Sequence, residues 1–141
     1  MRTDLFNSIN LKRGISPYDH GTGDAAVVSQ IIDMQGVDQL VFAIATGSLA
    51  DADATFTVLI EESDDSGMSG ATAVADADLL GTEALAGFVF SDDNKCFKIG
   101  YKGQKRYVTC TITPANNTGV ALLCVVAITV PQILPTVNPP A

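Results

Sequence analysis

The residue types that most often carry catalysis are sparse in this 141-residue chain, which has one histidine and three cysteines. His20 lies in a segment without regular periodicity, and no serine or cysteine has an evident base beside it in the sequence. Cys96, Cys110 and Cys124 form no CxxC pair, so we expect them to be small apolar residues of a reduced core. These patterns predict no catalytic residues, no cofactor and no resident metal, and therefore a protein that is not an enzyme.

Two Asp-Ala-Asp pairs, Asp51 with Asp53 and Asp76 with Asp78, are the residues best suited to bind a cation. Carboxylates one residue apart can coordinate calcium, as at the start of an EF-hand loop. The glycine and the bidentate glutamate that complete such a loop are missing, which favours solvated loop carboxylates. An ion held between loops by either pair stays an open alternative.

The charge of −8 is distributed unevenly along the chain. Between Gln39 and Asn94 there are eleven acidic residues and no lysine or arginine. Phosphate backbones bind through clustered cations and are repelled by such an acidic field, so we expect no nucleic-acid partner.

The basic residues gather near the start of the chain and after position 94. Exposed lysines on a strand commonly protect a sheet edge from aggregation, and they can also dock onto an acidic protein surface. With one apolar anchor from the N-terminal segment, the candidate partner-binding residues are Arg2, Phe6, Lys12, Arg13, Lys98, Lys102, Lys105 and Arg106.

The chain begins without the apolar stretch of a secretory signal, and its longest apolar run, Val120 to Val130, is too short to span a bilayer. We therefore expect synthesis in a cytoplasm and no membrane partner.

Glycine and proline positions, together with the hydrophobic periodicity, divide the chain into three regions. Residues 1–24 contain Gly14, Pro17, Gly21 and Gly23 and predict an extended N-terminal arm. Residues 25–131 predict the folded domain, and residues 132–141 predict a proline-rich C-terminal tail.

The domain shows the alternation of short β-strands separated by turn residues. Thr55 to Glu62 alternates most clearly, and Leu122 to Val130 is continuously apolar, as expected for a strand covered on both faces. The remaining expected strands are Val27–Ile32, Leu40–Thr46, Val74–Leu80, Gly87–Phe90, Cys96–Lys102 and Tyr107–Thr113.

In Cys96–Lys102, Phe97, Ile99 and Tyr101 should face inward, with Lys98 and Lys102 outward. Ala71–Ala86 could hold a helical turn instead of a strand. Seven or eight short strands at this spacing predict an all-β jelly roll or related β-sandwich.

Several of these segments resemble a family of small structural proteins of tailed bacteriophages, the capsid cement (decoration) proteins. The resemblance lies in Gly23–Val28, Ala50–Val58, Asp92–Gly103 and Thr111–Gly119, and it covers roughly residues 23 to 130. It implies a jelly-roll protein on the exterior of an icosahedral virion capsid that clamps neighbouring major capsid subunits. It also implies paired copies, hence a homodimer or other self-association on the shell.

Two other functions remain open at this point. One is a glycan- or receptor-binding virion module, which would ordinarily use exposed aromatic residues, although the chain has no tryptophan. The other is a head–tail joining or tail component, which would be present in low copy number.

Overall fold

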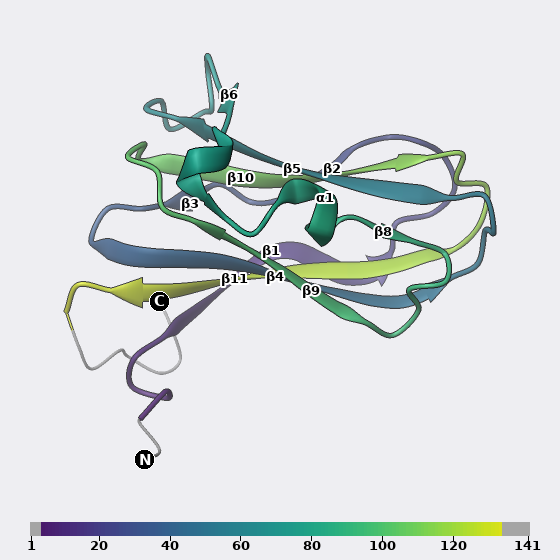
Figure 1. Ribbon diagram of the computed structural model, residues 1–141, viewed down its shortest axis with the longest axis horizontal. Helices are drawn as coiled ribbons and strands as arrows, with labels where there is room; N and C mark the ends of the chain where they lie inside the picture. The colour runs from purple at the N-terminus through teal and green to yellow at the C-terminus, as the bar shows by residue number, and fades with distance from the viewer. Residues whose placement is uncertain (1–3, 134–141) are drawn as a thin grey trace.

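The computed structural model describes residues 4–133, which form two antiparallel β-sheets packed face to face (Figure 1). In Figure 1 the first sheet, here called sheet A, lies below the second, sheet B. The all-β sandwich that the sequence predicts is therefore confirmed. The residues of the proposed C-terminal tail beyond Ile133, and Arg2 near the start of the chain, lie outside the described residues.

Sheet A has the strand order β1-β11-β4-β9-β7, with every neighbouring pair antiparallel. Its strands are β1 (Asn10–Asp19), β11 (Ala121–Pro131), β4 (Val37–Leu49), β9 (Cys96–Tyr101) and the short β7 (Leu79–Leu80). The first and last strands along the chain are thus neighbours, and β11 occupies a position between β1 and β4.

Sheet B is built around two long strands, β10 (Tyr107–Ala115) and β5 (Thr55–Ser63). Short strands cover their outer edges: β2 (Val27–Val28) and β3 (Ile32–Asp33) pair with β10, and β6 (Thr72–Ala73) and β8 (Phe88–Val89) pair with β5. The sequence predicts one strand over Val27–Ile32, and the structure divides that region into two short strands.

The core lies between the sheets and consists of the inward side chains that the alternating patterns predict. Phe42, Ile44, Phe56, Ile60 and Ile112 are almost completely inaccessible to solvent. The rings of Phe56 and Phe88 stack at a centroid distance of 4.8 Å, which joins β5 to β8 within this core.

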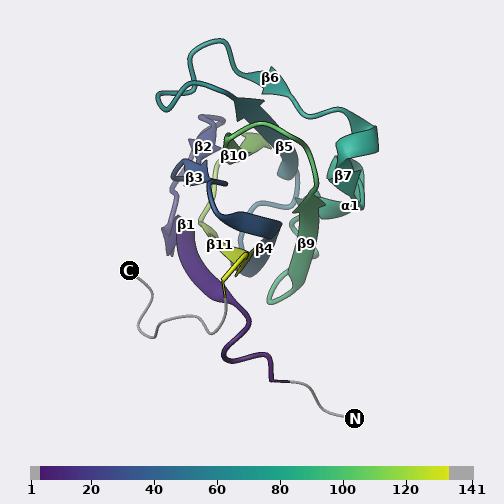
Figure 2. The same ribbon diagram turned by 90° about the vertical axis from the view of Figure 1, so that its left-hand side faces the viewer.

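A short helix, α1 (Glu83–Ala86), lies at one open side of the sandwich, against β5 and β9 (Figure 2). Thr82 caps it, because its hydroxyl oxygen accepts a hydrogen bond from the Leu85 backbone N–H at 3.1 Å. A single 3-10 turn, η1 (Asp76–Asp78), precedes β7. The alternative of a helical turn within Ala71–Ala86 is therefore confirmed, while Val74–Leu80 contains only the two-residue strand β7. Neither of these helices is long enough to cross a membrane.

The structure differs from the sequence-based prediction at the N-terminal segment. The sequence predicts a loose arm over residues 1–24, but Asn10–Asp19 form β1 and pair with β11 from Asn10 opposite Thr129 to Asp19 opposite Leu122. Register shifts beside Gly14 and before Tyr18 interrupt the alternation, so the sequence carries no periodic signal there. Of the expected arm, residues 4–9 and 20–24 lie outside this strand, whereas Asn10–Asp19 belong to sheet A.

A second difference concerns β11. Its residues alternate between buried and partly exposed, so one face of this apolar strand is not covered within the chain. The expectation that Leu122–Val130 is covered on both faces is therefore wrong for the isolated chain, and this face leads to the candidate functional site.

Candidate docking surface

The outer face of sheet A is a broad apolar surface, here called the A face. The pairing register places the side chains of Val126 and Ile128 beside those of Ala43 and Val41 on the side away from the core. Leu11 of β1 lies in the same row as Ile128, and Leu80 of β7 extends that row past Gly100. Leu11, Leu80 and Leu122 are 50%, 56% and 37% exposed. The further members are Ala45, Cys96, Cys124 and Val130.

Monomeric soluble proteins rarely expose an apolar surface that extends over several adjacent strands. Scattered exposed apolar residues are ordinary, but here they occupy successive rows of four strands. The A face therefore has the character of a protein interface.

Charge is distributed in a way that sets the A face apart from the rest of the chain. The chain has sixteen aspartates and glutamates, and none of them falls within Leu11–Tyr18, Leu40–Leu49, Cys96–Tyr101 or Val120–Pro131. Arg13 and Lys98 are the cations whose register places them on this face. A strongly acidic protein thus presents one large surface whose central part is free of carboxylates, as the core of an interface requires, while Asp19 lies at its margin, opposite Leu122.

The A face contains a hollow of about 280 Å³ near the end of β1. Pro17 and Tyr18 of β1 line it on one side and Ala45 with Gly47 of β4 on the other, while Leu122 and Cys124 of β11 lie between them. A side chain at Gly47 would collide with Leu122, since a Cβ there would lie 2.9 Å from the Leu122 Cβ. The hollow is lined mainly by apolar groups and suits an apolar side chain of a partner.

At the opposite end of β1, residues 4–9 project beyond sheet A on its outer side, in both Figure 1 and Figure 2. A compact turn closes this segment: the Asn7 backbone N–H donates to Asp4 Oδ1 at 3.1 Å, and the Ser8 hydroxyl donates to the Asp4 carbonyl at 2.6 Å. Leu5 and Phe6 are 64% and 66% exposed in this turn. We call these two residues and their turn the N-terminal prong.

Two of the predicted partner-binding cations form ion pairs within the chain. Arg106 donates from Nε and Nη2 to the two carboxylate oxygens of Asp33 at 3.0 and 2.9 Å, which lowers the pKa of Asp33 and raises that of Arg106. Lys105 pairs with Asp64, and this hydrogen bond raises the pKa of the Lys105 ammonium group. These cations link the loop that precedes β10 to the end of β3 and to the segment that follows β5.

The other predicted cations lie in three different places. Lys98 is on the A face, exposed and without an ion pair in residues 4–133, and Lys102 follows β9 in the same exposed state. Lys12 lies on the edge strand β1, and its charge contributes to lowering the pKa of the Asp33 carboxyl group. Arg13 lies on the A face at the edge strand. The prediction that Lys98 and Lys102 are exposed, with Ile99 and Tyr101 inward, is confirmed.

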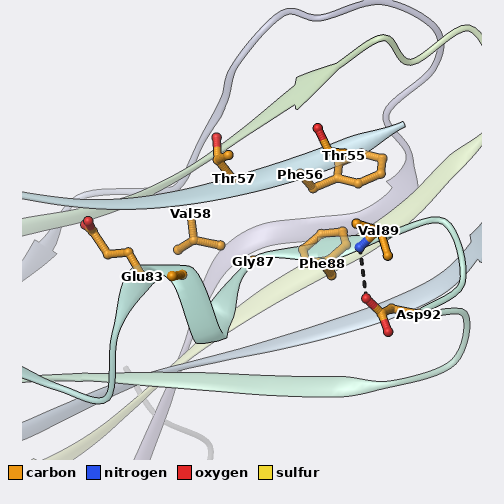
Figure 3. A pocket seen from close by; sticks show the side chains of 10 residues that line it. Thr55, Phe56, Thr57, Val58, Glu83, Gly87, Phe88, Val89 and Asp92 are labelled. Carbon is orange, nitrogen blue, oxygen red and sulfur yellow. Dashed lines mark hydrogen bonds between the residues drawn. The ribbon is translucent and has the colours of Figure 1, made fainter. Parts of the chain in front are cut away.

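A second candidate site is the pocket of about 390 Å³ between β5, α1 and β8 (Figure 3). Its two carboxylates already have partners. Glu83 Oε1 accepts a hydrogen bond from the Ile60 backbone N–H at 2.7 Å. Asp92 accepts from the Val89 N–H at 2.9 Å and pairs with Lys95 at 2.8 Å, and the Lys95 bond is the main reason that the pKa of Asp92 is lowered. These contacts assign the pocket a structural role in holding α1 and β8 against β5.

The remaining residues that could take part in catalysis or bind an ion also have local structural roles. The His20 ring nitrogen Nε2 lies 3.1 Å from the Ser16 carbonyl and 3.2 Å from the Leu123 carbonyl, which ties the end of β1 to β11. Asp51 accepts from the Thr118 backbone N–H at 2.7 Å, and the pKa of its carboxyl group is lowered mainly by the Thr118 hydroxyl. No cluster of potential metal ligands occurs in residues 4–133.

The cysteines are unpaired and occupy three different environments. Cys110 is completely buried, as expected for a small core residue, and burial raises the pKa of its thiol to about 12. Cys96 is exposed and Cys124 is half-buried, both on the A face, so the expectation of three core cysteines is wrong for these two.

The A face itself is not among the candidate sites that the sequence indicates. The signal is present in Leu122–Val130, whose apolar residues occur on both sides of the strand. Only the register with β1 and β4 shows that one side is not covered.

Comparisons with family models and with curated protein sequences find no match to this chain.

Proposed function

We propose that the protein is a structural component of a virion, which binds the exterior of an icosahedral phage head and stabilises the contacts between major capsid subunits. The observation that carries the proposal is the A face, a wide apolar surface whose central part carries no carboxylate, on an otherwise acidic protein. Such a surface is suited to be covered by protein in a permanent assembly.

The β-sandwich supports this role because it presents the A face as a rigid platform. The strands that form the face are held by the core beneath them, so binding orders few groups and loses little conformational entropy. The resemblance of residues 23–130 to capsid cement proteins is our reason for proposing the phage head as the assembly to which the protein binds.

A protein that binds only the assembled shell stabilises it through mass action, because disassembly then also requires release of the bound copies. Many copies add their contributions even where each interface is modest. Such a protein needs neither a catalytic group nor a cofactor.

The experiment is a binding assay of the purified protein with assembled phage heads and, separately, with unassembled capsid subunits. We expect saturable binding to heads at a copy number proportional to the capsid subunits, and much weaker binding to free subunits. Occupancy confined to a single ring per particle would contradict the proposal and favour a head–tail or tail component. Absence of binding to heads would also contradict it.

The link to the A face is tested in the same assay with Ala43→Glu, which places a carboxylate on the central strand of that face. Thr57→Glu is the matched control, because Thr57 is an exposed strand residue on sheet B. We expect the first variant to lose occupancy and the second to bind as the unaltered protein does.

A further inference from the structure

We propose that the hollow of the A face and the carboxylate of Asp19 beside it form a binding site for an arginine side chain of the protein that covers this face. The inference deepens the proposed function and rests on it, because it names the group that a major capsid subunit would contribute. Three features support it: the apolar lining of the hollow, the carboxylate at its margin and an exposed tyrosine ring.

The hollow suits the aliphatic part of a long side chain. Its volume is about 280 Å³, and none of the residues of the described chain, 4–133, that line it is charged. Pro17, Ala45 and Leu122 supply apolar surface from the three strands that surround it. The aliphatic stem of an arginine commonly packs on such a surface while its charged end stays at the margin.

Asp19 places a carboxylate at that margin. It pairs with Leu122 in the register of β1 and β11, so the two side chains share a face of sheet A, and Leu122 lines the hollow. The backbone N–H groups of Gly21 and Ala121 donate to Asp19 Oδ1 at 2.8 and 3.1 Å. Within residues 4–133 Asp19 forms no ion pair, and both of these hydrogen bonds end on Oδ1, which leaves Oδ2 for a donor from a partner.

The charge of Asp19 decides between an arginine and a neutral side chain. The hydrogen bond from the Gly21 N–H, followed by that from Ala121, lowers the pKa of Asp19, so the carboxylate is ionised at neutral pH. A partner with a neutral side chain in the hollow would cover this charge without a counter-ion, at a cost in binding free energy. A guanidinium group at the margin removes that cost, and arginine is among the residues that most often anchor protein interfaces.

Tyr18 provides an aromatic surface in the same place. Its side chain is 58% exposed and lines the hollow. The His20 ring packs against the Tyr18 ring at a centroid distance of 4.2 Å, and His20 Nε2 lies 3.1 Å from the Ser16 carbonyl oxygen, which holds the pair of rings at the end of β1. A planar guanidinium group stacks on a tyrosine ring and donates to a carboxylate at once, whereas the lysine ammonium group is a compact, strongly hydrated point charge. The site therefore favours arginine over lysine.

The site can be tested without a phage head, by titrating N-acetylarginine amide into the full chain labelled with nitrogen-15. N-acetylcitrulline amide is the matched probe, because citrulline has nearly the same shape as arginine and no charge. We expect the arginine probe, at millimolar concentration, to shift the amide resonances of Tyr18, Gly47 and Leu122. The citrulline probe should bind about fivefold more weakly, since it forms no ion pair with Asp19.

Two pairs of variants separate the carboxylate from the hollow. Asp19→Asn keeps an oxygen that accepts from the Gly21 and Ala121 N–H groups, and it should abolish the preference for arginine over citrulline. Asp53→Asn, an equal loss of charge at an exposed residue that does not line the hollow, should preserve the preference. Ala45→Leu should fill the hollow and prevent binding of both probes, whereas Ala43→Leu, on the same strand outside the hollow, should not. Circular dichroism should show that all four variants are folded.

On assembled phage heads, Asp19→Asn should lower the affinity about tenfold, as expected for the loss of one hydrogen bond between charged groups. It should also make the affinity less sensitive to added salt, because an ion pair is screened by salt and a purely structural change is not. Asp53→Asn should match the unaltered protein in both measurements.

Three results would overturn the inference: no shift of the hollow resonances by the arginine probe, equal binding of the arginine and citrulline probes, or tighter binding of the corresponding leucine or lysine amide. If Asp19→Asn binds heads with the affinity and salt dependence of the unaltered protein, the inference is also overturned, but the proposed function stands. If the arginine probe binds as expected and the unaltered protein fails to bind heads, the proposed function alone is overturned.

Discussion

The Tyr101 hydroxyl lies 2.6 Å from Glu62 Oε2 and connects the two sheets of the sandwich, since Tyr101 belongs to β9 and Glu62 to β5. The Lys105 backbone N–H donates to the same hydroxyl at 3.0 Å. Gly103 makes the arrangement possible, because a Cβ at this position would lie 2.6 Å from the Tyr101 ring and 2.7 Å from Glu62. One phenol thus connects both sheets and the loop between β9 and β10.

We expect Tyr101→Phe to lower the free energy of unfolding by about 1–3 kcal/mol, because it removes a hydrogen-bonding hydroxyl and leaves its partners unsatisfied. Tyr101 is only 3% exposed, so water cannot readily replace that hydroxyl. Urea unfolding followed by circular dichroism measures the change. Tyr107→Phe is the control, and an equal loss in both variants would contradict the role assigned to the Tyr101 hydroxyl.

The same residue predicts a loss of stability at alkaline pH. Burial, followed by the hydrogen bond to Glu62, raises the pKa of Tyr101 in the folded protein above its ordinary value. The unfolded chain therefore releases this proton first, and the stabilisation present below pH ~10 declines as the pH rises further, by up to about 1.4 kcal/mol per pH unit. Unfolding free energies measured across this range should fall more steeply for the unaltered protein than for Tyr101→Phe; identical slopes would contradict the prediction.

Glu83 should hold α1 in place at the side of the sandwich. Its carboxylate accepts the Ile60 backbone N–H, a donor on the edge of β5 that has no strand partner at that point. We expect Glu83→Ala to cost about 1–3 kcal/mol of stability, because the N–H loses its acceptor. Glu83→Gln keeps an acceptor oxygen and should cost less. Hydrogen exchange at Ile60 is the direct measurement, and exchange that is unchanged in Glu83→Ala would count against this role.

The three cysteines should react with a thiol reagent in the order of their exposure. Cys96 should react first and Cys124 more slowly, whereas Cys110 should react only on unfolding, because it is buried and its pKa is raised to about 12. Labelling with time-resolved mass spectrometry assigns each rate. Cys110 labelling in the native state would contradict the buried assignment.

The β-sandwich could be predicted because alternation in β5 and β10 is a local pattern. Val108, Cys110 and Ile112 face inward in β10 as their spacing indicates. β1 could not be predicted in this way. Its apolar residues are few and its alternation is broken at Gly14, and its pairing with β11 joins segments from opposite ends of the chain.

The candidate site depended even more strongly on distant contacts. Lys105 and Arg106 looked available for a partner, yet their acidic partners Asp64 and Asp33 are 41 and 73 positions away. The A face likewise follows from the register of four strands, which no local pattern reports. Composition did carry a general indication, since 47% apolar and 17% charged residues are typical of a chain that is partly covered by other protein.

The position of β11 between β1 and β4 has a consequence for biosynthesis. During translation β1 and β4 emerge early, but β1 has no partner in sheet A, and β4 has only β9, until the last strand leaves the ribosome. The nascent chain therefore holds the apolar residues of β4 exposed through most of its synthesis. Folding dominated by such distant pairings is slow and exposed to aggregation, so this topology gives chaperones a long interval in which to bind the emerging chain.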